Sequence, residues 1–139
     1  MGKVIFNAET LKLMSLFERF TKSKLKDCII TDNLVIFVVK EGYASKAIGK
    51  NGANVKALQN KLNRKIKIVE FNSNLSQFVE NLLLPLKLEE VYEDNKIVFV
   101  KSKDFNIKSI LIGRNGSNLR KTETLVRRYF PDLKEIKVI

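Results

Sequence analysis

The sequence contains an internal repeat, and this repeat constrains the fold more than any other feature. Residues 48–56 are Ile-Gly-Lys-Asn-Gly-Ala-Asn-Val-Lys, and residues 112–120 are Ile-Gly-Arg-Asn-Gly-Ser-Asn-Leu-Arg. The first glycines of the two copies, Gly49 and Gly113, are 64 residues apart. Self-similarity at a fixed period indicates one structural unit that occurs more than once in the chain.

The elements expected around each copy follow one order: helix, strand, strand, helix, GxxG loop, helix and strand. Apolar residues at near-helical spacing indicate the helices, and short or alternating apolar runs indicate the strands. In the first half the elements are expected at 8–20, 25–31, 34–39, 43–48, 55–62 and 65–70. In the second half they are expected at 75–83, 86–92, 96–101, 105–112, 119–129 and 134–139, with turns at 32–33 and 93–95 and a short strand at 1–6.

This order predicts an α+β fold of two tandem domains, residues 1–72 and 73–139. Each domain is expected to be a three-stranded mixed sheet covered on one face by three helices. The boundary falls near residues 71–74, where the last strand of the first half ends. Six apolar side chains are expected in the cores: Phe17, Phe20, Phe37, Phe78, Phe99 and Cys28.

The chain is strongly basic, which narrows the class of its partner. It has 26 Lys and Arg residues against 15 Asp and Glu residues, for a net charge of +11. Residues 1–72 contain 14 basic and 6 acidic residues, whereas residues 73–139 contain 12 and 9. Such a surplus favours a polyanionic partner, and RNA, DNA and acidic membranes are the candidates.

The absence of histidine removes several classes of catalytic site. Without histidine there is no His-based acid–base catalysis, no Ser–His or Cys–His nucleophile pair and no His metal ligand. The acidic residues at 89–90 and 93–94 surround an expected turn and lack metal-ligand spacing. We therefore expect no enzymatic activity, no catalytic residue, no metal and no cofactor.

The location that we expect is the cytoplasm. The N-terminus lacks the pattern of a signal peptide, and no apolar run approaches the roughly 20 residues that cross a bilayer. A single cysteine cannot form an internal disulfide, which is consistent with a reducing compartment.

The two GxxG loops have the chemistry of a phosphate-binding turn. Glycines allow a tight turn between helices, and the turn exposes backbone N–H groups at the start of the second helix, where an anion is favoured. Lys50 and Arg114 add a positive charge at matching points, and Asn51 and Asn115 tolerate left-handed backbone geometry. Neither loop has the Lys-Ser or Lys-Thr of a nucleotide-binding P-loop.

Each half resembles a KH domain, whose GxxG loop holds about four nucleotides. The extra helix and strand before the core are similar to the type II, prokaryotic variety. The tandem pair resembles the KH pair of NusA transcription factors. Because neither an S1 domain nor a large N-terminal domain is present, it is most similar to the short archaeal version of that family. The resemblance covers about residues 9–70 and 74–139.

The resemblance implies a set of RNA-binding residues in each half. Val55 and Leu119, with the isoleucine before each loop, would form an apolar floor beneath the bases. The exposed backbone of 66–68 and 135–137 would offer hydrogen bonds to base edges. The implied RNA-binding residues are Ile48, Gly49, Lys50, Asn51, Gly52, Asn54, Lys56, Ile66, Lys67, Ile68, Ile112, Gly113, Arg114, Asn115, Gly116, Asn118, Arg120 and Lys121.

The function implied is single-stranded RNA binding on nascent transcripts, in NusA-like termination or antitermination. A ribosome-associated or ribosome-biogenesis KH protein is the alternative. The expected partners are single-stranded RNA and either RNA polymerase or the ribosome, and the sequence leaves that choice open. No membrane partner is expected, and we expect a monomer.

Overall fold

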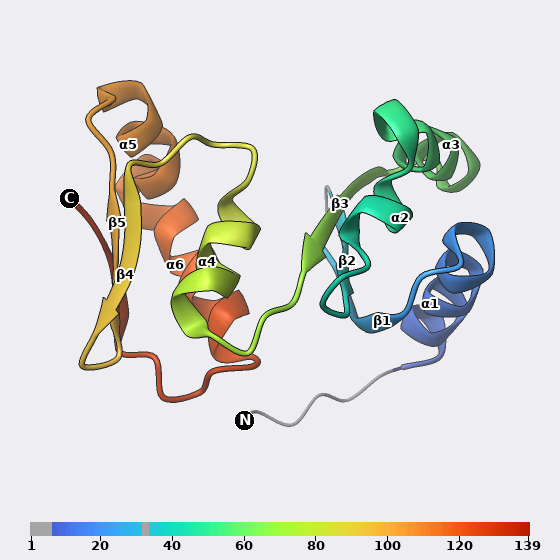
Figure 1. The fold of residues 1–139 in the computed structure, drawn as a ribbon, viewed down its shortest axis with the longest axis horizontal. Coiled ribbons are helices and arrows are strands. Elements are labelled where there is room, and N and C mark those ends of the chain that lie inside the picture. The colour runs from blue at the N-terminus through green and yellow to red at the C-terminus, as the bar shows by residue number, and fades with distance from the viewer. Residues whose placement is uncertain (1–6, 32–33) are drawn as a thin grey trace. The chain divides into compact units, whose positions relative to one another are not determined.

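The computed structural model describes residues 7–31 and 34–139 (Figure 1). The strand expected at 1–6 and the turn expected at 32–33 lie outside the described residues. The described chain divides between Asn72 and Ser73 into two compact units. We call the described residues up to Asn72 the first unit and Ser73–Ile139 the second unit.

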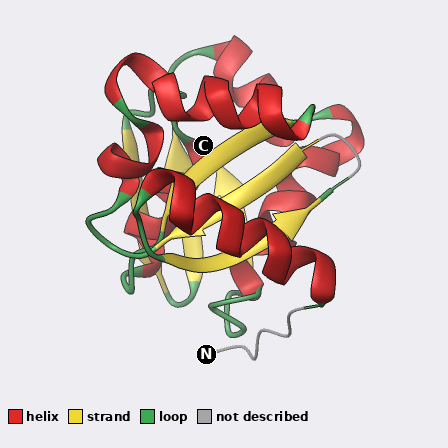
Figure 2. Cartoon of the chain, turned by 90° about the vertical axis from the view of Figure 1, so that its right-hand side faces the viewer, coloured by secondary structure: helices red, strands yellow, loops and turns green. Residues whose placement is uncertain are grey.

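The first unit has a mixed sheet of three strands in the order β1-β2-β3. β1 pairs antiparallel with β2, and β3 pairs parallel with β2, so the chain must cross over between these two strands. Helices α2 and α3 form this crossover, and Figure 2 shows helices lying across the strands. The elements are α1 (Ala8–Thr21), β1 (Leu25–Ile30), β2 (Leu34–Val39), α2 (Ala44–Ile48), α3 (Ala53–Leu62) and β3 (Lys65–Glu70).

The second unit repeats the same order and topology. Its sheet has the order β4-β5-β6, with β4 antiparallel and β6 parallel to β5. The three helices lie on one side of the strands in Figure 1. The elements are α4 (Leu75–Leu83), β4 (Glu90–Asp94), β5 (Ile97–Lys101), α5 (Phe105–Ile112), α6 (Ser117–Arg127) and β6 (Glu135–Val138). The α+β class and the mixed three-stranded sheets predicted from the sequence are confirmed.

Aromatic contacts lie at the centre of both cores. In the first unit Phe17 of α1 stacks on Phe37 of β2 with ring centroids 4.2 Å apart, and both side chains are fully buried. Cys28 is buried in the same cluster, as expected. In the second unit Phe78 of α4 meets Tyr129 edge to face at 5.5 Å. Burial of one such aromatic side chain accounts for several kcal/mol of the stability of a small domain.

The expectation that Phe20 belongs to the core is wrong, since its side chain is 39% exposed. The buried face of α1 passes through Thr10, Phe17 and Thr21, which are separated by seven and four residues. Phe20 lies at the margin of this stripe. Thr21 can occupy a buried position because its hydroxyl donates a hydrogen bond of 2.8 Å to the Phe17 carbonyl.

The first hairpin of the second unit is shifted relative to its prediction. Leu86 donates its N–H back to the Leu83 carbonyl in a turn at 3.0 Å, so the strand begins at Glu90 and not at 86. The turn lies at Asn95 and Lys96, which have φ values of 52° and 66°. Two successive left-handed residues match the two-residue turn that suits the twist of a hairpin.

Phe99 also lies outside the helix-covered core. Strand residues alternate between faces, and Val98 and Val100 on either side of Phe99 are fully buried. Phe99 therefore points to the opposite face, where its ring stacks on Tyr92 with a centroid distance of 5.1 Å.

The contrast between Phe17 and Phe20 gives a stability prediction. We expect Phe17→Ala to lower the free energy of unfolding by about 3–5 kcal/mol, because a fully buried aromatic side chain leaves a cavity. We expect Phe20→Ala to change it by less than about 1 kcal/mol. Urea denaturation measures both, and equal losses would contradict this description of the α1 stripe.

Candidate nucleic-acid interface

The two GxxG loops have nearly identical backbones, although their sequences differ at the basic residue. Gly49 and Gly113 have φ/ψ values of 79°/168° and 72°/179°, a region essentially restricted to glycine. Asn51 and Asn115 have φ values of 54° and 56°, in the left-handed region that asparagine tolerates. Each loop closes with a hydrogen bond from the second glycine to the carbonyl of the first, at 3.1 and 3.2 Å.

An asparagine side chain spans the turn in each copy. Asn54 donates from Nδ2 to the carbonyl of Lys46 in α2 at 3.1 Å, and Asn118 donates to the carbonyl of Ile110 in α5 at 2.9 Å. These bonds tie the helix after the loop to the helix before it. We call each of them an asparagine latch. Asn54 and Asn118 were expected to bind RNA, and the structure places their amide nitrogens on protein carbonyls.

The latch explains why the first glycine of each loop has no side chain. A Cβ at Gly49 would lie 2.9 Å from Cγ of Asn54, and a Cβ at Gly113 would lie 2.6 Å from Cγ of Asn118. Both distances are shorter than real Cβ contacts. The second glycine differs, because a Cβ at Gly52 would meet no atom within 4 Å. All four glycines have a positive φ, and the first glycine of each loop must also leave room for the latch.

The residues between the glycines project into solvent. Lys50 and Arg114, with the asparagines that follow them, are exposed at the tips of the two loops. Arg120 donates from Nη2 to the carbonyl of Asn115, which places a guanidinium beside the second loop. Lys56, at the equivalent position in the first copy, is exposed, as is Lys121. The structure thus places Arg120 beside the second turn and leaves Lys56 and Lys121 exposed on the helices that follow the loops.

The outer edge of each sheet runs beside the helix that follows the loop. The Ile66 N–H of β3 donates to Oε1 of Gln59 at 3.1 Å, and the Ile136 N–H of β6 donates to Oε2 of Glu123 at 2.8 Å. Both N–H groups face away from the neighbouring strand. Sequence reasoning missed Gln59 and Glu123, although their separation equals the 64-residue period and would have indicated equivalent roles.

The backbone of residues 66–68 was expected to be available for hydrogen bonds to bases, but the Ile66 N–H is already bonded to Gln59. The backbone N–H and C=O groups of alternate strand residues point to the same side. Those of Ile68 therefore point outward like those of Ile66, and those of Lys67 point toward β2. The side chains of Ile66 and Ile68 pack into the helix-covered core. Lys67 therefore lies on the opposite face from the loop, where burial lowers its pKa. The structure does not bring Lys67 together with the other predicted site residues.

The four residues expected to form an apolar floor lie on either side of the two loops. Ile48 and Ile112 directly precede the loops, and the Ile112 side chain is 37% exposed. Val55 and Leu119 lie three residues after the second glycine, partly exposed on the helices that start there. Apolar residues therefore flank the GxxG turn in both units.

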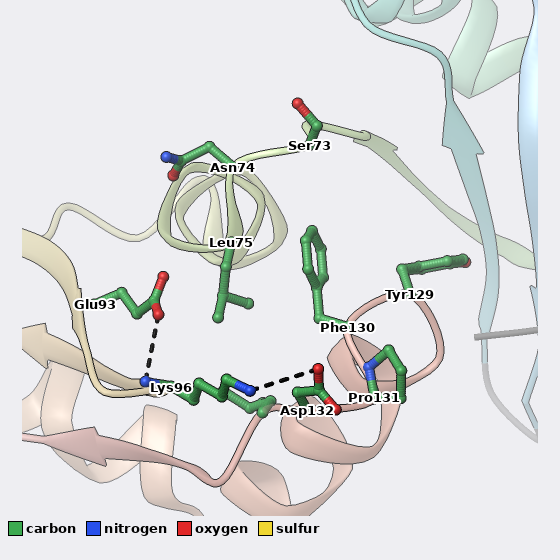
Figure 3. Close-up of a pocket in the computed structure, with 10 residues that line it drawn as sticks. Ser73, Asn74, Leu75, Glu93, Lys96, Tyr129, Phe130, Pro131 and Asp132 are labelled. Carbon is green, nitrogen blue, oxygen red and sulfur yellow. Dashed lines mark hydrogen bonds and ion pairs between the residues drawn. The ribbon is translucent and has the colours of Figure 1, made fainter. Parts of the chain in front are cut away.

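Residues 7–31 and 34–139 contain neither a metal-binding cluster nor a membrane-spanning helix. No group of three or more His, Cys, Asp or Glu side chains there could hold a metal ion. No helix of the described chain is long and apolar enough to cross a bilayer. The second unit has a pocket of about 450 Å³, crossed by the Lys96–Asp132 ion pair of 3.6 Å (Figure 3), and it contains no GxxG residue.

Comparison with known proteins identifies the family. The KH domain family matches residues 13–104. The chain belongs to the KH-domain family. A protein named "Probable transcription termination protein NusA" from Methanocaldococcus jannaschii is 30% identical over 143 residues, covering 100% of this chain and 77% of the relative. One of the same name from Methanococcus vannielii is 33% identical over 141 residues, covering 99% and 80%.

A solved structure agrees with these relationships. The chain in "Crystal structure of APE1850" is 30% identical and superposes with a TM-score of 0.72, covering 96% of this chain and 100% of that chain. This KH protein is therefore NusA-like over nearly its whole length. KH domains as a class hold four backbone nucleotides at the GxxG loop, the element that is built twice here.

The latch predicts coupling between Gly113 and Asn118. We expect Gly113→Ala to lower the free energy of unfolding by about 2 kcal/mol or more, because backbone strain and the clash with the Asn118 side chain add. In an Asn118→Ala background the contacts with Cγ and Nδ2 are removed and only the contact with Cβ at 2.8 Å remains, so the loss should be smaller. Urea denaturation of the double-mutant cycle measures this coupling.

Gly116→Ala is the matched control for this cycle. Gly116 also has a positive φ, of 74°, but the nearest atom to its Cβ would be 3.6 Å away, on Arg120. Its effect should therefore be additive with that of Asn118→Ala. Additivity at both glycines would mean that the clash with the latch does not restrict position 113.

Proposed function

We propose that this chain binds single-stranded RNA through both GxxG loops and acts on nascent transcripts in the control of termination or antitermination. The two domains would be residues 1–72 and 73–139, each of the type II KH variety with three helices. The chain would act in the cytoplasm as a monomeric binding protein and not as an enzyme. RNA polymerase would be its protein partner.

One observation carries the RNA-binding proposal: the GxxG loop is built twice with the same backbone, and only its basic residue differs. Both copies keep the left-handed asparagine, the latch and an exposed cation at the first variable position. The φ and ψ angles of the two turns agree within about ten degrees, which indicates a common constraint on both loops. A phosphodiester that accepts from the N–H groups at the start of α3 or α6 would impose one, because a helix N-terminus favours an anion.

The transcription role rests on the relatives. The proteins from the two methanogens are named as probable transcription termination proteins, and the chain aligns with them along its whole length. The net charge of +11 suits a nascent transcript, which is polyanionic and single-stranded as it leaves a polymerase. Sequencing of RNA crosslinked to the protein in cells tests this role. Transcript leaders are the expected targets, and enrichment of mature ribosomal RNA would favour the ribosome instead.

Reversal of the charge at each loop tests the RNA-binding site. We expect Lys50→Asp with Asn51→Asp, or Arg114→Asp with Asn115→Asp, to abolish RNA binding by the altered domain without unfolding it. Carboxylates at the loop tip repel phosphate, and the replaced side chains are exposed, so stability should change by less than about 1 kcal/mol. Titration of a labelled oligonucleotide and thermal melts measure the two effects.

A second pair of substitutions separates local repulsion from a general loss of charge. Lys12→Asp with Ser15→Asp makes the same change in net charge on exposed positions of α1, away from the loop. This control should weaken binding only modestly. If the chain with both loops altered keeps its affinity, or the control loses as much, the loops are not the binding site.

Ionic strength gives an independent check on phosphate contact. We expect the logarithm of the binding constant to fall linearly with the logarithm of salt concentration, by about 0.7 for each phosphate that is neutralised in a single strand. Altering one loop should reduce this slope, because fewer phosphates are then neutralised. Titrations at several potassium chloride concentrations measure the slope, and an affinity that ignores salt would contradict the prediction.

A further inference from the structure

Gln59 and Glu123 occupy equivalent places in the two domains and differ in chemistry. Each lies on the helix that follows the GxxG loop, one turn beyond the floor residue Val55 or Leu119, and therefore on the same helix face. Each accepts a hydrogen bond from the outward N–H of the edge strand. The side chain thus bridges the apolar floor and the strand edge, the two surfaces between which a base would lie.

The bond to the strand determines which atoms of each side chain remain available. An N–H group only donates, so Gln59 must place Oε1 on Ile66, and its Nε2 keeps two N–H donors. Glu123 places Oε2 on Ile136, and its Oε1 remains as an acceptor. The first domain therefore presents donors at this point, whereas the second presents an acceptor with negative charge. Both side chains are partly exposed.

The neighbouring strand groups make this point a place where bases can be distinguished. The N–H groups of Ile66 and Ile136 are already bonded, so the outward-facing backbone groups that remain are the carbonyls of these two residues and the N–H and C=O groups of Ile68 and Val138. A base edge that bonds to those backbone groups would lie next to the free atoms of Gln59 or Glu123. Hydrogen bonds to base edges are what give sequence preference, whereas phosphate contacts only position the strand.

We propose that Gln59 and Glu123 are specificity-determining residues that give the two domains opposite base preferences. This proposal rests on the proposed RNA-binding function. The donors of Gln59 favour a base with a carbonyl acceptor on its edge, such as uracil. The free oxygen of Glu123 favours a base with an exocyclic amino group, such as cytosine, and it repels a carbonyl.

Oligonucleotides of cytosine and of uracil test the two base preferences most directly. The two pyrimidines have the same size and differ at position 4, where cytosine has an amino group and uracil a carbonyl oxygen, and at position 3, where cytosine has an acceptor nitrogen and uracil an N–H. Labelled eight-nucleotide oligo(C) and oligo(U) are titrated against the full chain. The Lys50→Asp, Asn51→Asp background isolates the second domain, and the Arg114→Asp, Asn115→Asp background isolates the first.

Exchanging the two residues should reverse the preferences. The second domain should prefer oligo(C), and Glu123→Gln should lower the ratio of oligo(C) to oligo(U) affinity by about tenfold, the factor that one hydrogen bond of about 1.4 kcal/mol gives. In the first domain Gln59→Glu should raise the ratio by a similar factor. Both replacements keep a side-chain oxygen that can accept from the N–H of Ile66 or Ile136, so the outer strand should keep its position.

The ratio also separates base preference from charge and from structure. Glu80→Gln, at an exposed position of α4, removes the same charge and should leave the ratio unchanged. If Glu123→Gln and Gln59→Glu alter both affinities equally, the residues only support the strand edge and the proposal is overturned. If the parent chains bind neither oligonucleotide, the RNA-binding function itself fails. Binding that keeps the same ratio in every variant overturns the base preference alone.

Discussion

The hydrogen bond from an asparagine amide across each GxxG turn is the interaction on which the candidate site depends. It joins the helix before the loop to the helix after it, at 3.1 Å in the first domain and 2.9 Å in the second. The bond is made over a glycine, because a Cβ there would occupy the space of the asparagine side chain. A loop held in this way presents its N–H groups and its cation without needing RNA to order it. Pre-organisation lowers the entropic cost of binding.

The same sheet topology serves the loop and the strand edge. β3 and β6 are parallel to their neighbours, so each must be reached through a helical crossover, and the GxxG turn lies within that crossover. The crossover carries Gln59 and Glu123 to the outer strand, where they accept from its N–H groups. The GxxG turn and the outer edge of the sheet are therefore positioned by one continuous helix in each domain.

The two domains are equivalent in backbone and unequal in charge. The first has 14 basic and 6 acidic residues, and the second has 12 and 9. The helix side chain that accepts from the edge strand follows the same trend, because it is a glutamine in the first domain and a glutamate in the second. The exposed lysine at position 56 is replaced by Arg120, whose guanidinium donates to the second loop. On the proposed function, the larger positive charge of the first domain would supply more of the attraction to phosphate.

The amino-acid sequence by itself determined the element order, the repeat and the position of the loops. The 64-residue period and the alternation of apolar residues are local properties of the chain, and β3, α4 and α5 begin and end at their expected residues. The start of β4 and the exposure of Phe20 were mispredicted. Both depend on neighbours: a turn bond from Leu86 to Leu83, and a buried stripe that includes two threonines.

Only the tertiary structure decided which contacts the matching positions of the two repeats make. Two kinds of hydrogen bond show this: the latch, and the bonds from the edge strand to Gln59 and Glu123. They join residues that are seven to thirteen positions apart. Such bonds form between a helix and a separate helix or strand, so no pattern along the chain specifies them. They follow from packing. The parallel pair of strands in each sheet must be joined by a helical crossover, and side chains of that crossover then meet the unpaired edge of the outer strand.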